Sequence, residues 1–485
     1  MIISLFSTRV ILQALGIDDY GIYTLVGSTV AIFTSMRGLF SASTQRFINY
    51  ELGRGNEDAL NKIFNNSVVI HLILSVVFIA FVEVVGLWFI ENKMLLPDGY
   101  DIGRVRIVFQ LSLAATVVTI MTVPFDATLI AHENIKMYSV FTVLDAVLKL
   151  LCIYSLFLVA SNRLIIYGVL ILAVSLLMRI ANALYCKRKY IECTFNFNID
   201  KPLLIKMCKF AGWGFLGTTV FAIVNEGGNM MLNAFGGADV NAARGVAYQV
   251  KNALYVFVAN TMLVFTPQII KAYAAEQKGR FAELISVASK VSAYLFILFG
   301  IPVFIFTDDI LHLWLKTVPP FTSEMIRYII IYLFFRSLHG GIDTFFKAKG
   351  VIKNYQIVES IVLFITLPIG YLLLRSGYEV YYFFAVMLGV EIINFVAIIL
   401  LATLKYGFNI KLYLKKTIAP ISYSLLVLLL SSAIVEYFAP ANVHWVLKIA
   451  IILVVNLVAL FFIGVSRNER IALRKVVFTQ KTKEK

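Results

Sequence analysis

Apolar segments long enough to cross a hydrocarbon core roughly 30 Å thick follow one another along almost the whole chain. Short polar breaks with turn residues and charges separate them, as in GIDDYG, LGRGNED and LPDGYDIG. We expect about fourteen transmembrane helices, over residues 1–15, 20–45, 64–90, 105–131, 137–160, 164–186, 208–235, 241–270, 284–307, 324–348, 355–374, 379–404, 413–437 and 445–465. The pattern therefore predicts an all-α integral membrane protein.

The composition excludes a water-soluble fold, because the 485 residues are 60% hydrophobic and only 15% charged, whereas a soluble domain carries roughly 25% charged residues. The net charge of +15 is spread over short clusters between apolar segments, so we expect the bilayer and not nucleic acid as a partner. The four cysteines, Cys152, Cys186, Cys193 and Cys208, match neither a metal site nor a redox motif. No metal or cofactor is expected.

Basic residues occupy every second break between the apolar segments, and the intervening breaks are acidic or nearly neutral. By the positive-inside rule, the basic breaks face the cytoplasm, and an even number of helices leaves both termini there. The apolar start MIISLFSTRVILQALG has no basic leader or cleavage site, so we expect no signal peptide. As a first span it is short, and either neighbouring helices complete it or the natural start lies upstream.

Two pairs of segments about 220 residues apart indicate an internal repeat of the kind found in transporters. RVILQALG from Arg9 matches NMMLNAFG from Asn229, and DATLIAHENIKMY from Asp126 matches DTFFKAKGVIKNY from Asp343. Pro124 and Gly341 each precede the repeated aspartate by two residues, so we expect both helices to be weakened there. Asp126 and Asp343 are predicted to have equivalent structural roles.

Each repeat holds six helices, so the two lobes should form a parallel pseudo-twofold repeat followed by two appended C-terminal helices. We place the N-terminal lobe with its basic linker at residues 1–205 and the C-terminal lobe at 206–405. Residues 406–485 hold the appended pair and a basic cytoplasmic tail.

Charges inside apolar segments are the candidate functional residues, because a charge at the bilayer centre costs at least roughly 2.5 kcal/mol unless it has a partner or water. Predicted helices one, two and eight carry Arg9, Arg37, Arg244 and Lys251 without an acidic residue on the same helix. These four cations could line a cavity for a pyrophosphate, which arginine binds in bidentate geometry. Salt bridges to carboxylates on other helices are the alternative.

Two further clusters of polar residues lie within apolar segments. Predicted helix seven contains Asn225, Glu226, Gly227, Gly228 and Asn229, a polar and glycine-rich stretch that suggests a hinge or a cavity lining, or a close helix crossing. Predicted helix ten carries Arg336, His339, Asp343 and Lys347 on one face. That face is either a self-neutralising stripe or part of an ion or proton path.

The stretch STRVILQALGIDDYGIYTL, with the GRGN segment around Arg54, the helix number and the two lobes, resembles the polysaccharide-exporter branch of the multidrug/oligosaccharidyl-lipid/polysaccharide exporter (MOP) superfamily. The resemblance implies an O-antigen or capsule repeat-unit flippase in the bacterial cytoplasmic membrane. Such a protein moves an undecaprenyl-pyrophosphate-linked oligosaccharide by alternating access, coupled to a proton or sodium gradient or to the membrane potential. It would work beside polysaccharide polymerase machinery.

Three other functions compete with this one. A multidrug or cation antiporter of the same superfamily should favour an acidic cavity, whereas the unpaired charges here are basic. A flippase for the peptidoglycan lipid precursor would share both the helices and the basic cavity. A membrane polysaccharide polymerase or ligase would be an enzyme, but no paired carboxylates, metal-ligand cluster or nucleophile motif appears at a suitable loop. We therefore expect no enzymatic activity.

Overall fold

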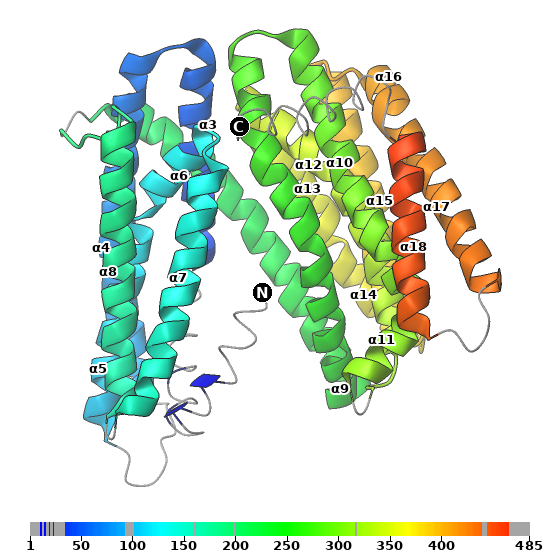
Figure 1. Cartoon of the computed structure of the whole chain (residues 1–485), viewed down its shortest axis with the longest axis horizontal. Coiled ribbons are helices and arrows are strands. Elements are labelled where there is room, and N and C mark those ends of the chain that lie inside the picture. Colours follow the sequence, from blue (N-terminus) through cyan, green and yellow to red (C-terminus); the bar gives the residue numbers. More distant parts are fainter. Residues whose placement is uncertain are drawn as a thin grey trace, which may run out of the picture. The chain divides into compact units, whose positions relative to one another are not determined.

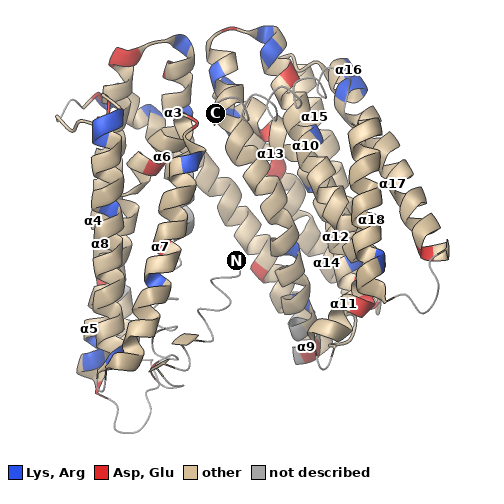
Figure 2. Ribbon diagram, in the orientation of Figure 1, with Lys and Arg blue, Asp and Glu red and all other residues tan. Residues whose placement is uncertain are grey.

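The computed structural model describes residues 34–92, 101–159, 162–196, 199–315, 318–438 and 444–464, with residues 10, 11, 14, 15, 19 and 23 in addition. The regular structure of these residues is helical (Figure 1). Lys and Arg gather at the ends of helices, for example on α16 (Ile410–Tyr413), and a smaller number of charges lies along the apolar helices (Figure 2).

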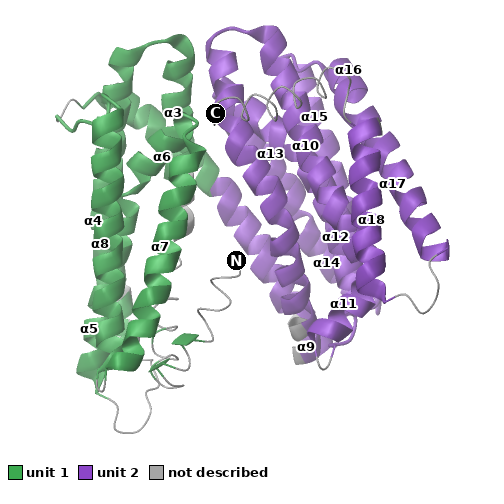
Figure 3. Ribbon diagram, in the orientation of Figure 1, with its two compact units in different colours: residues 1–215 green, residues 216–485 purple. Residues whose placement is uncertain are grey.

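The chain forms two compact units, residues 1–215 and 216–485 (Figure 3). The helices before α9 belong to unit 1: α3 (Thr34–Arg54), α4 (Glu57–Asn92), α5 (Ile102–Ile120), α6 (Val123–Ala131), α7 (Ile135–Ser155) and α8 (Arg163–Lys189). The unit boundary falls inside α9 (Lys201–Ala274), and the later helices belong to unit 2: α10 (Lys278–Ile305), α11 (Thr307–Trp314), α12 (Thr322–Lys349), α13 (Ile352–Phe364), α14 (Thr366–Arg375), α15 (Tyr382–Tyr406), α16, α17 (Ala419–Phe438) and α18 (Trp445–Ala459). The predicted division at residues 205 and 405 stays a prediction.

Twelve helical segments of the described residues are long and apolar enough to cross a membrane. They match the predicted third to fourteenth spans one for one, from Glu57–Trp88 to Trp445–Phe462. The predicted first span and the first part of the second lie largely outside the described residues. The all-α membrane class is thus confirmed, and the total of fourteen stays a prediction.

Backbone turns recur at matching places in the two repeats. Gly55 and Glu276 both have positive φ, at 69° and 57°, and the next helix begins two residues after each. Glu133 and Gly350 also have positive φ, at 59° and 72°, and again a helix begins two residues later. Left-handed backbone is uncommon outside glycine, so its recurrence at matching positions supports the predicted duplication.

The helix breaks expected before Asp126 and Asp343 have different outcomes in the structure. Helix α5 ends at Ile120 and α6 begins at Val123 with Pro124 in its first turn, where its missing N–H costs nothing. Helix α12, in contrast, is continuous through Gly341, so the expected weakening there is wrong. A Cβ at Gly341 would lie 2.7 Å from the Ile285 carbonyl oxygen, so this glycine allows α10 and α12 to pack closely.

The glycine-rich stretch of α9 is helical as well. The one described residue of α9 with non-helical backbone is Gly237, with φ of 73°, between the segments Lys201–Leu232 and Ala243–Ala274 that could each span a membrane. A Cβ at Gly228 would lie 2.7 Å from the ring of Phe383 on α15. Gly228 therefore fits the close-crossing interpretation, since a larger residue would push α15 away.

Candidate functional site

A small pocket in unit 2 has two cations of α9 beside it. Its volume of about 20 Å³ is room for one water molecule. Its lining comes from α9, α12, α13, α14 and α15: Phe221, Val224, Asn225, Tyr248, Lys251, Tyr332, Leu363, Thr366 and Met387. The pocket thus lies where five helices of this unit meet.

Lys251 extends among aromatic rings. Its Nζ lies 4.5 Å from the ring centre of Tyr248, 5.4 Å from that of Tyr332 and 5.5 Å from that of Phe221. Such contacts contribute roughly 0.5–2 kcal/mol each, depending on how much water is excluded. The rings therefore hold the ammonium group at the pocket by its charge.

Arg244 lies on the same face of α9, seven residues before Lys251. Its guanidinium carbon lies 4.2 Å from the ring centre of Tyr248. Its Nη2 donates to the backbone carbonyl and to the side-chain oxygen of Asn225, at 2.9 and 3.0 Å. Among the residues that the structure describes, no carboxylate lies within ion-pair distance of Arg244 or Lys251.

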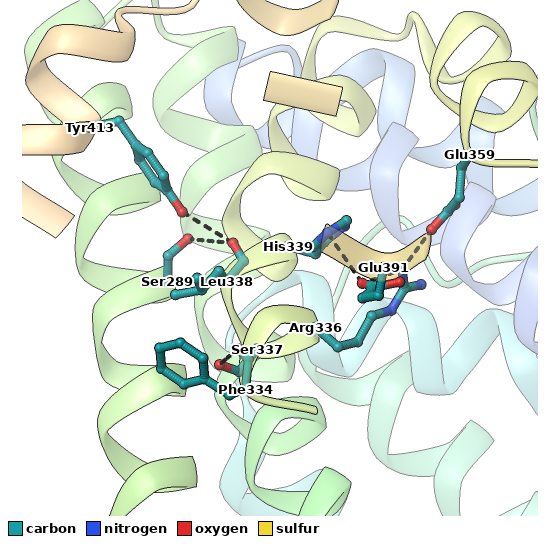
Figure 4. Close-up of polar contacts among 9 residues, drawn as sticks. All are labelled: Ser289, Phe334, Arg336, Ser337, Leu338, His339, Glu359, Glu391 and Tyr413. Atoms are coloured by element: carbon teal, nitrogen blue, oxygen red, sulfur yellow. Dashed lines mark hydrogen bonds and ion pairs between the residues drawn. The ribbon is translucent and has the colours of Figure 1, made fainter. Parts of the chain in front are cut away.

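A buried ionic cluster lies one helical turn beyond the pocket. Arg336 of α12 donates from Nη1 to Glu359 of α13 at 2.8 Å, and the same nitrogen lies 3.6 Å from Glu391 of α15 (Figure 4). His339 Nε2 lies 3.2 Å from Glu391. Three helices that are mostly apolar are thus joined by charged and ionisable side chains.

The pocket and the cluster form two successive layers. Tyr332, Leu363 and Met387 line the pocket, and each lies four residues from a member of the cluster, namely Arg336, Glu359 and Glu391 respectively. Four residues of helix are about 6 Å. The cations of α9 and the ionic cluster therefore belong to one site.

The cluster is fixed from the other side of α12. Tyr413 of α16 donates to the Leu338 carbonyl at 3.1 Å, and Ser289 of α10 donates to the same oxygen at 3.3 Å (Figure 4). Both hydroxyls are buried, so their bonds hold the turn that carries His339. The ring of Phe395 covers His339 at 5.2 Å between ring centres.

The remaining part of the predicted polar stripe on α12 is self-neutralising. Asp343 accepts from Lys347 of the next turn at 2.6 Å. Its repeat counterpart Asp126 accepts instead from Asn182 of another helix, α8, at 2.7 Å. The two aspartates recur in sequence but differ in their contacts, and their functional equivalence stays a prediction.

Unit 1 has a larger polar cavity of about 310 Å³ between α5, α6, α7 and α8. Its lining is Thr119, Thr122, Asp126, Tyr138, Phe141, Thr142, Asp145, Lys149, Ser175, Met178 and Asn182. Lys149 and Asp145 form an ion pair at 2.7 Å, as their spacing on one helix suggests.

A family model described as polysaccharide biosynthesis protein matches residues 2–273. That is more than half of the chain. The chain belongs to this family. No curated protein matches the chain.

Solved transporters share its fold. A MATE transporter of Vibrio cholerae is 15% identical, with a TM-score of 0.72 over 85% of this chain and 93% of that one. A MOP superfamily transporter of Pyrococcus furiosus, titled as having reverse polarity of its binding pocket, is 14% identical, with a TM-score of 0.67 over 81% and 89%. The chain therefore combines this family with the fold of these transporters and with the helices of a multi-pass membrane protein.

The structure brings together only part of the predicted site. Arg244, Lys251 and Asn225 meet at the pocket, whereas Glu226 is exposed. Gly227 approaches Leu367, where a Cβ would lie 3.1 Å away, and Asn229 is half-buried. Arg9 lies outside the described residues, and Arg37 lies on α3 with its side chain outside them.

Sequence reasoning had not assigned Glu359 and Glu391 to a site with Arg336 and His339. The available signal was one carboxylate in each of two otherwise apolar helices, a costly placement that calls for a partner. Choosing that partner required the packing of α15 against both α12 and α13.

Proposed function

We propose that this protein is a flippase that moves an undecaprenyl-pyrophosphate-linked oligosaccharide, an O-antigen or capsule repeat unit, across the bacterial cytoplasmic membrane by alternating access. The polysaccharide biosynthesis family and the transporter fold support a membrane transporter in such a pathway. The proposed substrate class depends on the residues of the site, because a fold alone does not determine which substrate a protein binds.

The observation that carries the proposal is the pair Arg244 and Lys251, without an ion-pair carboxylate among the described residues and set among aromatic rings. A pyrophosphate brings negative charge, and two unit charges 4 Å apart attract by roughly 4 kcal/mol at an effective dielectric near 20. Aromatic rings offer apolar faces to sugar rings. A multidrug antiporter for cationic drugs would be opposed by the same two charges.

The test is export of surface polysaccharide in cells that depend on this protein. Lys251→Ala should lower export at normal protein level and membrane insertion, Lys251→Gln should do no better, and Lys251→Glu should be worse. The matched control is Lys448→Ala, which removes a lysine paired with Glu436 at 3.2 Å, away from the pocket. Normal export in Lys251→Ala, or loss only because the protein disappears, would contradict the cationic site.

We also propose that both termini face the cytoplasm. Single cysteines at Asp308 of α11 and Glu436 of α17, both exposed, should react with an impermeant maleimide in intact spheroplasts. Cysteines at Lys201 and Lys411 should stay unlabelled until the membrane is opened. The reverse labelling pattern would overturn the proposed orientation.

Loss of peptidoglycan synthesis in cells that lack the protein would instead favour a flippase for the peptidoglycan lipid precursor.

A further inference from the structure

We propose that Glu391 and His339 form a proton-binding site in the core of unit 2, where one exchangeable proton is held between carboxyl and imidazole. The ligand is the proton itself. The site is separate from the Asp343–Lys347 pair, which is neutralised within its own helix.

Burial is the first argument. Glu391 is 0% exposed and His339 is 3% exposed. Within the described residues, neither carboxyl oxygen of Glu391 and neither ring nitrogen of His339 makes a hydrogen bond of ordinary geometry to another described group. A buried ionised carboxylate without such a bond costs several kcal/mol. A proton on Glu391 turns one oxygen into a donor that faces His339 Nε2 at 3.2 Å and relieves this cost.

The hydrogen-bond partners of the two carboxylates also favour a proton on Glu391. From α12, Arg336 faces both carboxylates, but its hydrogen bond goes to Glu359, while Glu391 lies 3.6 Å from the same nitrogen. From α9, Lys251 acts on Glu391 through its charge, and Tyr332 of α12, Glu359 of α13 and Asn394 of α15 complete the surroundings. Among the described residues, Arg336 donates to Glu359 and leaves Glu391 without a hydrogen bond, which a proton on Glu391 would supply.

A path for the proton is the third argument. The pocket beside Lys251 has room for one water and lies one helical turn from Glu391 on α15, at Met387. Arg336 lies beside Glu391 and has a side chain that is 22% exposed. In this proposal, the proton therefore enters from the side of the pocket.

Proton and substrate should influence each other, and this step rests on the proposed function. Lys251 lines the pocket with Met387, one helical turn from Glu391, so its positive charge favours an ionised carboxylate there. An anion bound at Lys251 cancels that charge, so Glu391 should bind its proton more tightly. By reciprocity, the protonated protein should bind the anion more tightly.

Infrared difference spectroscopy on the full-length protein in phospholipid bilayers tests the site without any substrate. We expect a carbonyl band of a buried, protonated carboxyl that titrates with pH, is lost in Glu391→Gln, is shifted in Glu391→Asp and is unchanged in the control Glu436→Gln. His339→Gln should shift the band, since it removes the acceptor. A band that persists in Glu391→Gln, or a carboxyl that stays ionised at every pH, would overturn the proposal.

Proton uptake on addition of inorganic pyrophosphate to purified protein in weakly buffered solution tests the coupling. At a pH where the carbonyl band is largely lost, wild type should take up more protons than Glu391→Gln does, up to one per chain. Equal uptake in both would overturn the coupling. The infrared band and the movement of lipid-linked oligosaccharide are separate measurements. Failure of the proton site can therefore be distinguished from failure of the proposed function.

Discussion

The two units use the same positions of the repeat in opposite ways. In unit 1, Thr119, Thr122 and Thr142 line an open cavity of about 310 Å³. At the matching positions of unit 2, counted from the repeated aspartates, stand Arg336, His339 and Glu359, and the pocket beside them measures about 20 Å³. At these positions, unit 1 has threonines beside a polar cavity, whereas unit 2 has charged and ionisable side chains beside a much smaller pocket.

Hydrogen bonds explain why the threonines leave space. Each of these hydroxyls donates to the carbonyl four residues earlier in its own helix: Thr119 to Ala115, Thr122 to Val118 and Thr142 to Tyr138. Arg336 and His339 reach instead to α13 and α15. Side chains bonded to their own helix do not join helices, whereas charged partners on different helices do.

The largest expected effect comes from removing the central cation. Arg336→Ala leaves Glu359 and Glu391 buried without it, and breaking a buried pair costs roughly 3–5 kcal/mol. Lys149→Ala in unit 1 breaks an ion pair whose side chains are 39% and 35% exposed, so it should cost about 0–1 kcal/mol. Chemical denaturation in detergent would compare the free energies of unfolding, and equal losses would remove the distinction between the units.

Glycine packing should give an intermediate effect. Gly341→Ala forces a Cβ against the Ile285 carbonyl and Ser289 Oγ, and overpacking of this kind costs about 1–3 kcal/mol. The control is Gly389→Ala on α15, where a Cβ meets nothing within 4 Å. The free energy of unfolding of that variant should be unchanged or higher by up to about 1 kcal/mol. Similar melting temperatures for the two variants would contradict the close α10–α12 contact.

The smallest effect distinguishes the repeated aspartates. Asp126→Asn should cost about 1 kcal/mol, because a bond from Asn182 on another helix loses its charged acceptor. Asp343→Asn loses an ion pair within one helix whose side chains are 25% and 29% exposed, so it should cost somewhat more than the roughly 0.3–0.5 kcal/mol of an exposed pair. Unfolding curves of the two variants measure the difference. Matching losses, with matching transport defects, would favour the equivalence predicted from the repeat.

Hydropathy was enough to predict twelve spans that the structure contains, because a membrane helix is defined by the length and polarity of its own sequence. The repeated turns could also be aligned from sequence. The continuity of α12 through Gly341 could not be predicted, because a glycine that weakens a free helix equally permits close packing, and only the position of Ile285 decides between the two. The ionic cluster could not be predicted either, because its members lie on three helices whose packing the sequence pattern does not give.

The most direct test of the account is translocation by the purified protein in phospholipid vesicles. Vesicles would carry an undecaprenyl-pyrophosphate-linked oligosaccharide, and an impermeant glycosidase added outside would digest whatever reaches the outer leaflet. We expect full digestion with wild type, about half with protein-free vesicles, and slow digestion with Lys251→Ala. Digestion no greater than in protein-free vesicles, together with movement of a cationic dye by the same protein, would contradict the flippase and favour an antiporter.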